Sequence, residues 1–218
     1  MVEASVGGAV LRSQAILTNT RVTSDPLPRT IDAADDWPDL AARIDAAPED
    51  AKVRGMFLSE GLRLAPKSVK SNVRTHYVPF SLYPVREYMQ LLLQIARARY
   101  HSKPAASALL ELGFGVYSQF ASSIAGAAIF ATVEQDFRRV CELSPKAYSV
   151  TLKPGGTEVV YAAPNDAVVK LRDVWVYPDI FHAGIWLGAM DACGVSGSIE
   201  VRRHSLSDVD FHMHWQQR

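Results

Sequence analysis

The sequence is poor in the residues that mark several classes of functional site. Only two of its 218 residues are cysteines, Cys141 and Cys193, and no Cys-x-x-Cys pair occurs. Two isolated cysteines argue against a zinc knuckle and a disulfide framework, and they favour a reducing compartment. No stretch approaches the ~20 consecutive apolar residues that cross a bilayer, and the chain does not start like a secretory signal. We therefore expect a cytoplasmic protein without a membrane span.

An excess of charge of either sign is also lacking. Lysine and arginine together number 23, and aspartate and glutamate together number 23, so the formal net charge is zero. A chain with this balance has no overall field that would draw it to phosphate backbones, and we expect no nucleic-acid partner. Hydrophobic residues make up 48% of the chain, which suits one globular domain with a full core.

The familiar catalytic motifs are missing as well. There is no Gly-x-Ser-x-Gly, no His-Glu-x-x-His, and no cysteine–histidine pair in a recognisable nucleophile context. The segment "KPGGT" at 153–157 lacks the spacing of a phosphate-binding loop and predicts a turn into a strand. The segment "GFGVYS" at 113–118 lies in a helical pattern with no strand before it, which argues against a dinucleotide fingerprint. We name no catalytic residue, no metal ligand and no cofactor.

Regular apolar patterns are what the sequence does contain. Residues 1–35 are rich in Thr, Ser, Gly and Asp, and Pro26 and Pro28 interrupt them, so we expect an N-terminal extension with one strand at 9–17. Residues 36–218 are expected to form a single α+β domain. Its helical stretches, in which Asp36 is the first N-cap, cover 36–47, 53–65, 84–100, 103–123 and 124–145.

The pattern changes from a helical period to strand alternation after Pro154. Residues 157–176 predict a hairpin whose turn is "APND", residues 177–194 predict a helix ending at Gly194, and residues 197–216 predict a second hairpin. The order helices, hairpin, helix, hairpin predicts an α+β fold in which a helical layer packs on a twisted antiparallel sheet. The stretches at 103–145 are dense in Ala, Gly and Ser, which either lets helices approach closely or leaves room for a partner or cavity.

The histidines are the residues that most suggest chemistry. In the terminal "DFHMHW", strand alternation puts Phe211, Met213 and Trp215 on one face and His212 and His214 on the other. A zinc site would need further ligands, for which His204, Asp208 and Asp210 are the candidates, so water-facing histidines are the favoured interpretation. His182, near the start of a predicted helix, is interpreted as capping or exposed in preference to binding an anion.

Four segments carry a resemblance to a known family. The segments "DWPDLAARIDAAPEDAKVRGMF", "YPVREYMQLL", "YPDIFHAGIWLGAMDACG" and "FHMHW" resemble uncharacterised proteins of this size known mainly from myxobacteria. That family in turn resembles the 4-vinyl-reductase type of small-molecule-binding domain, whose broader fold is shared with TRAPP transport-complex subunits. Over residues 36–215 the resemblance implies helices on a twisted antiparallel sheet, a frequent homodimer and a hydrophobic pocket. It implies no reaction, and neither the metal-binding cysteine cluster of some relatives nor a haem-ligand signature is present.

These observations favour a non-catalytic binding or sensor domain for a hydrophobic small molecule. The candidate ligand-binding residues are aromatic or large aliphatic side chains of the predicted helices and of the first predicted hairpin. They are Tyr88, Leu92, Phe114, Tyr117, Phe120, Phe130, Trp175, Phe181 and Trp186. The alternative is a protein-interaction module, a homodimer or adaptor, without a ligand. An enzyme acting on a hydrophobic metabolite is the third and least favoured possibility.

Overall fold

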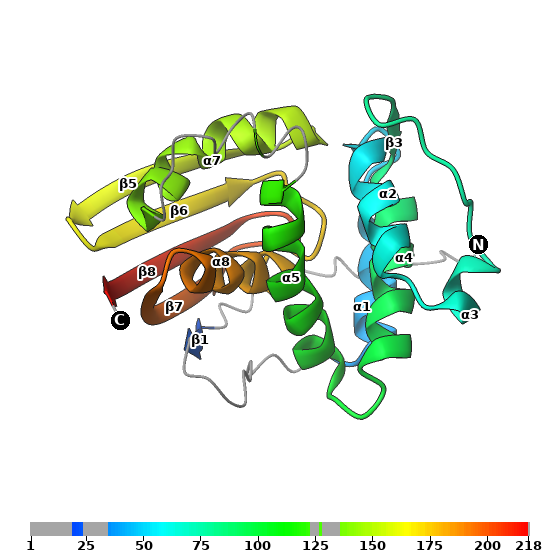
Figure 1. Ribbon diagram of the computed structural model, residues 1–218, viewed down its shortest axis with the longest axis horizontal. Coiled ribbons are helices and arrows are strands. Elements are labelled where there is room, and N and C mark those ends of the chain that lie inside the picture. Colours follow the sequence, from blue (N-terminus) through cyan, green and yellow to red (C-terminus); the bar gives the residue numbers. More distant parts are fainter. Residues whose placement is uncertain (1–18, 24–34, 123–126, 128–135, 218) are drawn as a thin grey trace, which may run out of the picture.

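The computed structural model describes residues 19–23, 35–122, 127 and 136–217. The expected strand at 9–17 and the candidate Phe130 lie outside the described residues. Figure 1 shows the main sheet on one side of the long helix α5 and the helices α1, α2 and α4 on the other. No helix in the described ranges is long and apolar enough to span a membrane.

The main sheet has five strands in the order β1-β7-β8-β6-β5, and all neighbouring pairs are antiparallel. Its strands are β1 (Asn19–Thr23), β5 (Gly156–Ala163), β6 (Asp166–Arg172), β7 (Val195–Arg203) and β8 (Val209–Gln217). A second sheet has the order β3-β2-β4, with β2 (Lys52–Arg54), β3 (Leu82–Pro84) and β4 (Leu152–Lys153). The α+β class, the antiparallel sheet and both predicted hairpins are confirmed.

Two of the described helices, α1 and α7, begin at an aspartate whose side chain caps the helix. The described helices are α1 (Trp37–Ala46), α2 (Gly55–Leu64), α3 (Lys67–Lys70), α4 (Val85–Arg99), α5 (Ala105–Ser122), α7 (Phe137–Thr151) and α8 (Phe181–Ala192). At the start of α1, Asp36 and Asp39 each accept a hydrogen bond from the other's backbone N–H, at 3.1 and 3.2 Å. This reciprocal cap fixes the helix start where the sequence predicts it.

Helix α7 differs from its prediction at both ends. The Asp136 side chain accepts from the backbone N–H groups of Arg138 and Arg139, so a helix begins at Phe137 in the middle of the predicted stretch. The helix then continues past Pro145 to Thr151. A proline inside a helix removes one backbone hydrogen bond, and here the Tyr148 hydroxyl, 2.6 Å from His182 Nδ1, joins the last turns to α8.

Glycines allow α5 and α8 to pack backbone against backbone. A Cβ atom placed on Gly113 of α5 would lie 2.1 Å from the Phe181 carbonyl oxygen, and one on Gly184 of α8 would lie 2.1 Å from the Leu110 carbonyl oxygen. No real side chain tolerates such a distance, so both positions require glycine. Gly113, in the stretch rich in small residues, therefore serves close helix approach, which is one of the two alternatives open from the sequence.

The predicted N-terminal extension includes one described strand. Strand β1 pairs with β7 through the register Thr20 to Val201, at the edge of the main sheet. Its pairing gives the edge of β7 a backbone partner. The division of the chain into an extension, 1–35, and a domain, 36–218, stays a prediction.

Candidate functional site

A partly enclosed cavity of about 90 Å³ lies among α5, α7 and α8. One residue each of α2 and α4, two of the small sheet and Val176 complete its lining. Its lining is almost entirely apolar and includes Val116, Phe120, Ile185 and Leu152. No lysine, arginine, aspartate or glutamate is among the described residues that line it. The cavity therefore suits an uncharged, apolar occupant.

Among the described lining residues, His182 is the one with a basic side chain. It is buried on α8, and its Nδ1 lies 2.6 Å from the Tyr148 hydroxyl of α7. Burial lowers the pKa of His182 to about 3, against a smaller opposing effect of the Asp179 carboxylate. The imidazole is therefore neutral at pH 7. The interpretation of His182 as capping or exposed is wrong, because the side chain turns inward between two packed helices.

Two nitrogen atoms of this lining have no hydrogen-bond partner among the described residues. They are Nε2 of His182 and Nε1 of Trp186, and both are buried. The two residues are four apart on α8, so their side chains lie on the same helix face. The hydroxyls of Ser144 and Thr151, by contrast, donate to the carbonyls of Cys141 and Tyr148, at 2.8 and 2.9 Å. Buried polar atoms without partners are rare, which singles out this pair.

The two cysteines lie outside the cavity lining and are not activated. Burial raises the pKa of the Cys141 thiol far above its ordinary value and that of Cys193 to about 11. Only the thiolate is a good nucleophile or metal ligand. Both thiols are therefore protonated at pH 7 and have the character of small apolar side chains.

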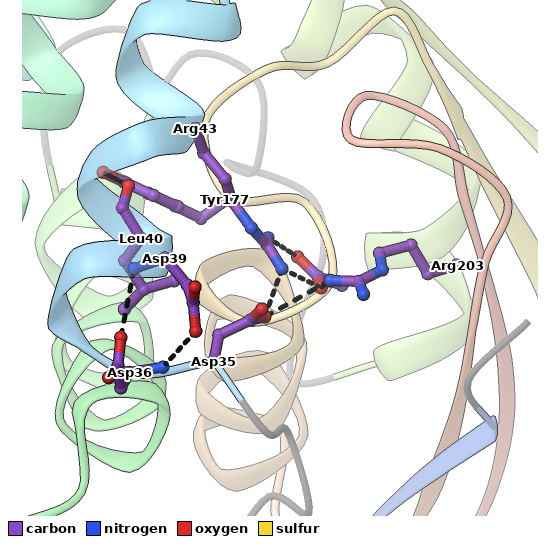
Figure 2. A network of polar contacts seen from close by, with 8 residues as sticks. Asp35, Asp36, Asp39, Leu40, Arg43, Tyr177 and Arg203 are labelled. Atoms are coloured by element: carbon purple, nitrogen blue, oxygen red, sulfur yellow. Dashed lines mark hydrogen bonds and ion pairs between the residues drawn. The ribbon is translucent and has the colours of Figure 1, made fainter. Parts of the chain in front are cut away.

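A second polar cluster, close to α8, is fully paired. Figure 2 shows Arg43 of α1, Arg203 of β7 and Asp35 converging on one another. Both arginines also pair with the carboxylate of Asp179. The two Arg43 Nη atoms lie 2.7 and 3.0 Å from the two Asp179 oxygens, and Arg203 Nη1 lies 2.9 Å from Asp179 Oδ2 and 3.2 Å from Asp35 Oδ2. Arg43 also binds Asp35. We call these four residues the ionic network.

The ionic network neutralises itself. Burial raises the pKa of Asp179, but the charge and hydrogen bonds of Arg43 and the charge of Arg203 outweigh that effect and keep the pKa below its usual value. Two arginines face two carboxylates, so the cluster has no net charge left for a ligand. Its arrangement ties α1 to the turn before α8 and to the sheet, which is a structural role.

The terminal histidines face water, as the strand alternation predicts. His212 and His214 are exposed, and Phe211, Met213 and Trp215 are buried. The candidate metal ligands have other partners: His204 Nε2 lies 2.9 Å from Asp210 Oδ2, and Asp208 accepts from the backbone of Asp173. In the part of the chain that the structure describes, no three His, Cys, Asp or Glu residues are placed to hold a metal ion.

Five of the nine candidate ligand-binding residues line the cavity. They are Tyr88, Tyr117, Phe120, Phe181 and Trp186. Leu92 is buried in the core, while Phe114 and Trp175 are half-buried against it, and none of these three is part of the lining. Trp175 instead donates from Nε1 to Asp173, at 2.8 Å.

Sequence reasoning missed Tyr148 and Arg43, and it named His182 but interpreted it as capping or exposed. Tyr148 follows Pro145, where the predicted helix ended, so its approach to α8 was not foreseen. Arg43 reads as an ordinary polar residue of an amphipathic helix, although it is 5% exposed. One available signal was the spacing of His182 and Trp186, which places two polar-tipped side chains on one face of an otherwise apolar helix.

Comparison with known families matches residues 47–216 to the model of the protein family of unknown function DUF2378. The chain belongs to this DUF2378 family. No curated protein matches it. The resemblance to uncharacterised proteins is thus confirmed at the level of a family, while the organism of origin stays a prediction.

The fold is similar to that of H-NOX domains of known structure. An NMR structure of an H-NOX domain from Shewanella oneidensis in the Fe(II)CO ligation state is 13% identical, with a TM-score of 0.53 over 76% of this chain and 99% of that one. A structure from work on H-NOX activation has a TM-score of 0.58 at 11% identity, over 75% and 97% of the two chains. A third, from work on haem distortion in the H-NOX family, has a TM-score of 0.54 at 11% identity, over 76% and 95%.

These likenesses correct one expectation. The similar structures are H-NOX domains and not 4-vinyl-reductase domains or TRAPP subunits. Both interpretations expect helices packed on an antiparallel sheet, which explains why the sequence pattern did not separate them. At these identities the likeness is one of fold.

Proposed function

We propose that this chain is a non-catalytic binding or sensor domain whose ligand is a hydrophobic small molecule held in the cavity against α8. The single observation that carries the proposal is the cavity itself, which has an apolar lining that includes His182 and Trp186, each with a buried nitrogen that has no partner among the described residues. A solid core would gain from filling the space and pairing the nitrogens, since each unpaired buried polar group costs about 1–3 kcal/mol. The H-NOX-like fold supports a sensor role.

Haem, the group named for the H-NOX family, fits this cavity poorly. His182 has a buried Nε2 without a partner among the described residues, but its Nδ1 faces the Tyr148 hydroxyl and not the carboxylate or carbonyl that usually stands behind a metal-binding histidine. The space of about 90 Å³ is far below the ~300–1,000 Å³ of pockets for drug-sized ligands. The two carboxylates of a haem would also meet no lysine or arginine among the described lining residues. We therefore assign no haem chemistry to the chain.

The size of the cavity narrows the class of ligand. A space of about 90 Å³ accommodates one small ring, or the end of an elongated molecule whose remainder extends outside. The lining offers aromatic faces from Tyr117, Phe181 and Trp186 and branched aliphatic side chains from Val140 and Ile185. Small aromatic or alicyclic metabolites and the ends of isoprenoid or acyl chains meet these limits.

A cavity-filling substitution tests the proposal. Ala147 of α7 lines the cavity, and Ala147→Leu adds three carbon atoms to it. We expect native mass spectrometry and organic extraction of the wild-type protein to yield a bound apolar molecule, and we expect Ala147→Leu to lose it while remaining folded. Ala42→Leu, at an exposed position of α1, is the matched control and should keep the ligand. Equal ligand content in all three proteins would overturn the proposal.

The second candidate is an interaction module that forms a homodimer. It is favoured by the side chains of Val78, Phe80 and Leu82, which are 49%, 69% and 43% exposed around β3. The zero formal charge of the chain adds no net repulsion between two copies. Light scattering of the wild-type protein and Phe80→Ser tests this function: a dimer that the substitution dissociates supports it, and a wild-type monomer contradicts it.

A further inference from the structure

We propose that the ligand presents a neutral acceptor oxygen, of the carbonyl type, to two N–H donors on α8: Trp186 Nε1–H and His182 Nε2–H. This inference rests on the proposed function and names the chemical class of the ligand at that site. It follows from the hydrogen-bonding requirements of three side chains, Tyr148, His182 and Trp186, and from the absence of charge around them.

The protonated nitrogen of His182 is determined by Tyr148. The Tyr148 hydroxyl lies 2.6 Å from His182 Nδ1, and this is its one hydrogen-bond partner in the described residues. A buried tyrosine O–H donates its proton where an acceptor is available. If the hydroxyl donates to Nδ1, the neutral imidazole carries its own proton on Nε2. Nε2 is then a donor, as Trp186 Nε1 always is.

Two N–H donors without an acceptor indicate which group the ligand contributes, namely a hydrogen-bond acceptor. His182 and Trp186 lie one helical turn apart on the same face of α8, and both line the cavity. A single oxygen with two lone pairs can accept from both. A carbonyl oxygen meets this requirement and brings no proton of its own that would need an acceptor.

Charge considerations restrict the oxygen to a neutral group. Burial favours the neutral form of His182, and no cationic side chain is found among the described lining residues. A carboxylate or phosphate would have to leave water for two neutral donors in an apolar space, which is costly. Ketones, aldehydes, quinones, esters and amides remain, with an apolar ring or chain attached.

A matched pair of small probes tests this inference with the full-length protein. Cyclohexanone and methylenecyclohexane have nearly the same shape and differ by C=O against C=CH₂. Affinities are measured by NMR titration for the wild-type protein, Trp186→Phe, and Trp175→Phe as the control outside the cavity lining. The ratio of the two affinities cancels any change in cavity size, because both probes fill the same space.

We expect Trp186→Phe to weaken cyclohexanone about fivefold to tenfold relative to methylenecyclohexane, which is the loss of one hydrogen bond. Trp175→Phe should leave the ratio unchanged within twofold. In the wild-type protein, cyclohexanone should move the indole N–H resonance of Trp186 downfield, and methylenecyclohexane should not. This readout needs no variant to fold.

The outcomes separate this inference from the proposed function. If both probes bind and the ratio is the same in all three proteins, the cavity accepts apolar ligands but the carbonyl inference is overturned. If methylenecyclohexane alone binds, the same conclusion follows. If neither probe binds, or an ordered water alone occupies the two N–H groups, the proposed function and this inference both fail.

Discussion

Two polar clusters lie within a few residues of each other around the start of α8, and they differ in how they are satisfied. In the ionic network, each of the two arginines pairs with both carboxylates. The residues are Arg43, Arg203, Asp35 and Asp179. In the cavity, His182 Nε2 and Trp186 Nε1 have no partner among the described residues. Paired buried groups hold elements together, whereas unpaired ones indicate that something else completes them. The contrast indicates a structural role for the first cluster and supports the proposal that the second one binds a ligand.

Breaking the ionic network should have the largest effect. Asp179→Ala leaves the Arg43 guanidinium buried with only Asp35 to neutralise it, and the expected loss in the free energy of unfolding is about 3–5 kcal/mol. Chemical denaturation measures this loss. The double substitution Arg43→Met with Asp179→Leu removes both charges and should recover most of it. A loss below about 1 kcal/mol for Asp179→Ala would show that the network is not a structural tie.

Acid should reveal the buried neutral histidine next. The pKa of His182 in the folded protein is about 3, below the ordinary value of about 6.5, so the unfolded chain binds a proton that the folded chain rejects. The stability that the buried neutral imidazole contributes is fully present above about pH 6.5 and is lost as the pH falls toward 3. Over this range the free energy of unfolding falls by about 1.4 kcal/mol per pH unit. The stability that Asp179 contributes through its lowered pKa starts to be lost only near its ordinary value of 3.8, at the acidic end of this range.

Denaturation curves from pH 7 to pH 4 test this dependence. His182→Gln should remove the slope that His182 contributes, so the stability of the wild-type protein relative to the variant should fall steadily from about pH 6.5 to pH 4. Parallel curves for the wild-type protein and His182→Gln would contradict the burial of a neutral imidazole.

Removing the hydrogen bond that orients His182 should have a smaller effect. Tyr148→Phe leaves Nδ1 without its donor, and we expect a loss of about 1–3 kcal/mol in the free energy of unfolding. The neutral imidazole then exchanges between its two tautomers, with the proton on Nδ1 or on Nε2, and the nitrogen chemical shifts of labelled histidine detect this exchange. Tyr161→Phe, which removes a half-buried hydroxyl bonded to the Arg138 carbonyl at 3.2 Å, is the comparison and should leave His182 unchanged.

The smallest effect is expected at the terminal histidines. His214 is exposed, and its Nδ1 lies 3.8 Å from Asp166 across two strands. Exposed pairs of this kind contribute little, so His214→Ala should change the free energy of unfolding by less than about 0.5 kcal/mol. A large loss, or a metal that copurifies with the wild-type protein and not with the variant, would give this pair a role beyond the surface.

Much of the fold could be predicted because local chemistry specified it. Asp36 marks the start of α1, and Gly194 follows the end of α8. The alternation from Val209 to Gln217 separates a buried face of β8 from a water-exposed one. Helix α7 was harder, because its cap at Asp136 lies inside the single helical stretch predicted for 124–145 and Pro145 suggested an end.

The site was only partly predictable for a different reason. Five candidate residues line the cavity because large aromatic side chains on apolar helices tend to meet in the interior. The pairing of Tyr148 with His182 joins α7 to α8 across residues 34 apart in sequence, and no local pattern encodes it. The ionic network is similar, since Arg43 and Asp179 are 136 residues apart.

A crystal structure of the protein purified directly from its native cells is the most direct test of the cavity as a ligand site. The result we expect is density for an apolar molecule enclosed by α5, α7 and α8, with an oxygen within hydrogen-bond distance of His182 and Trp186. A cavity closed by its own side chains, with both nitrogens paired inside the protein, would contradict the binding role.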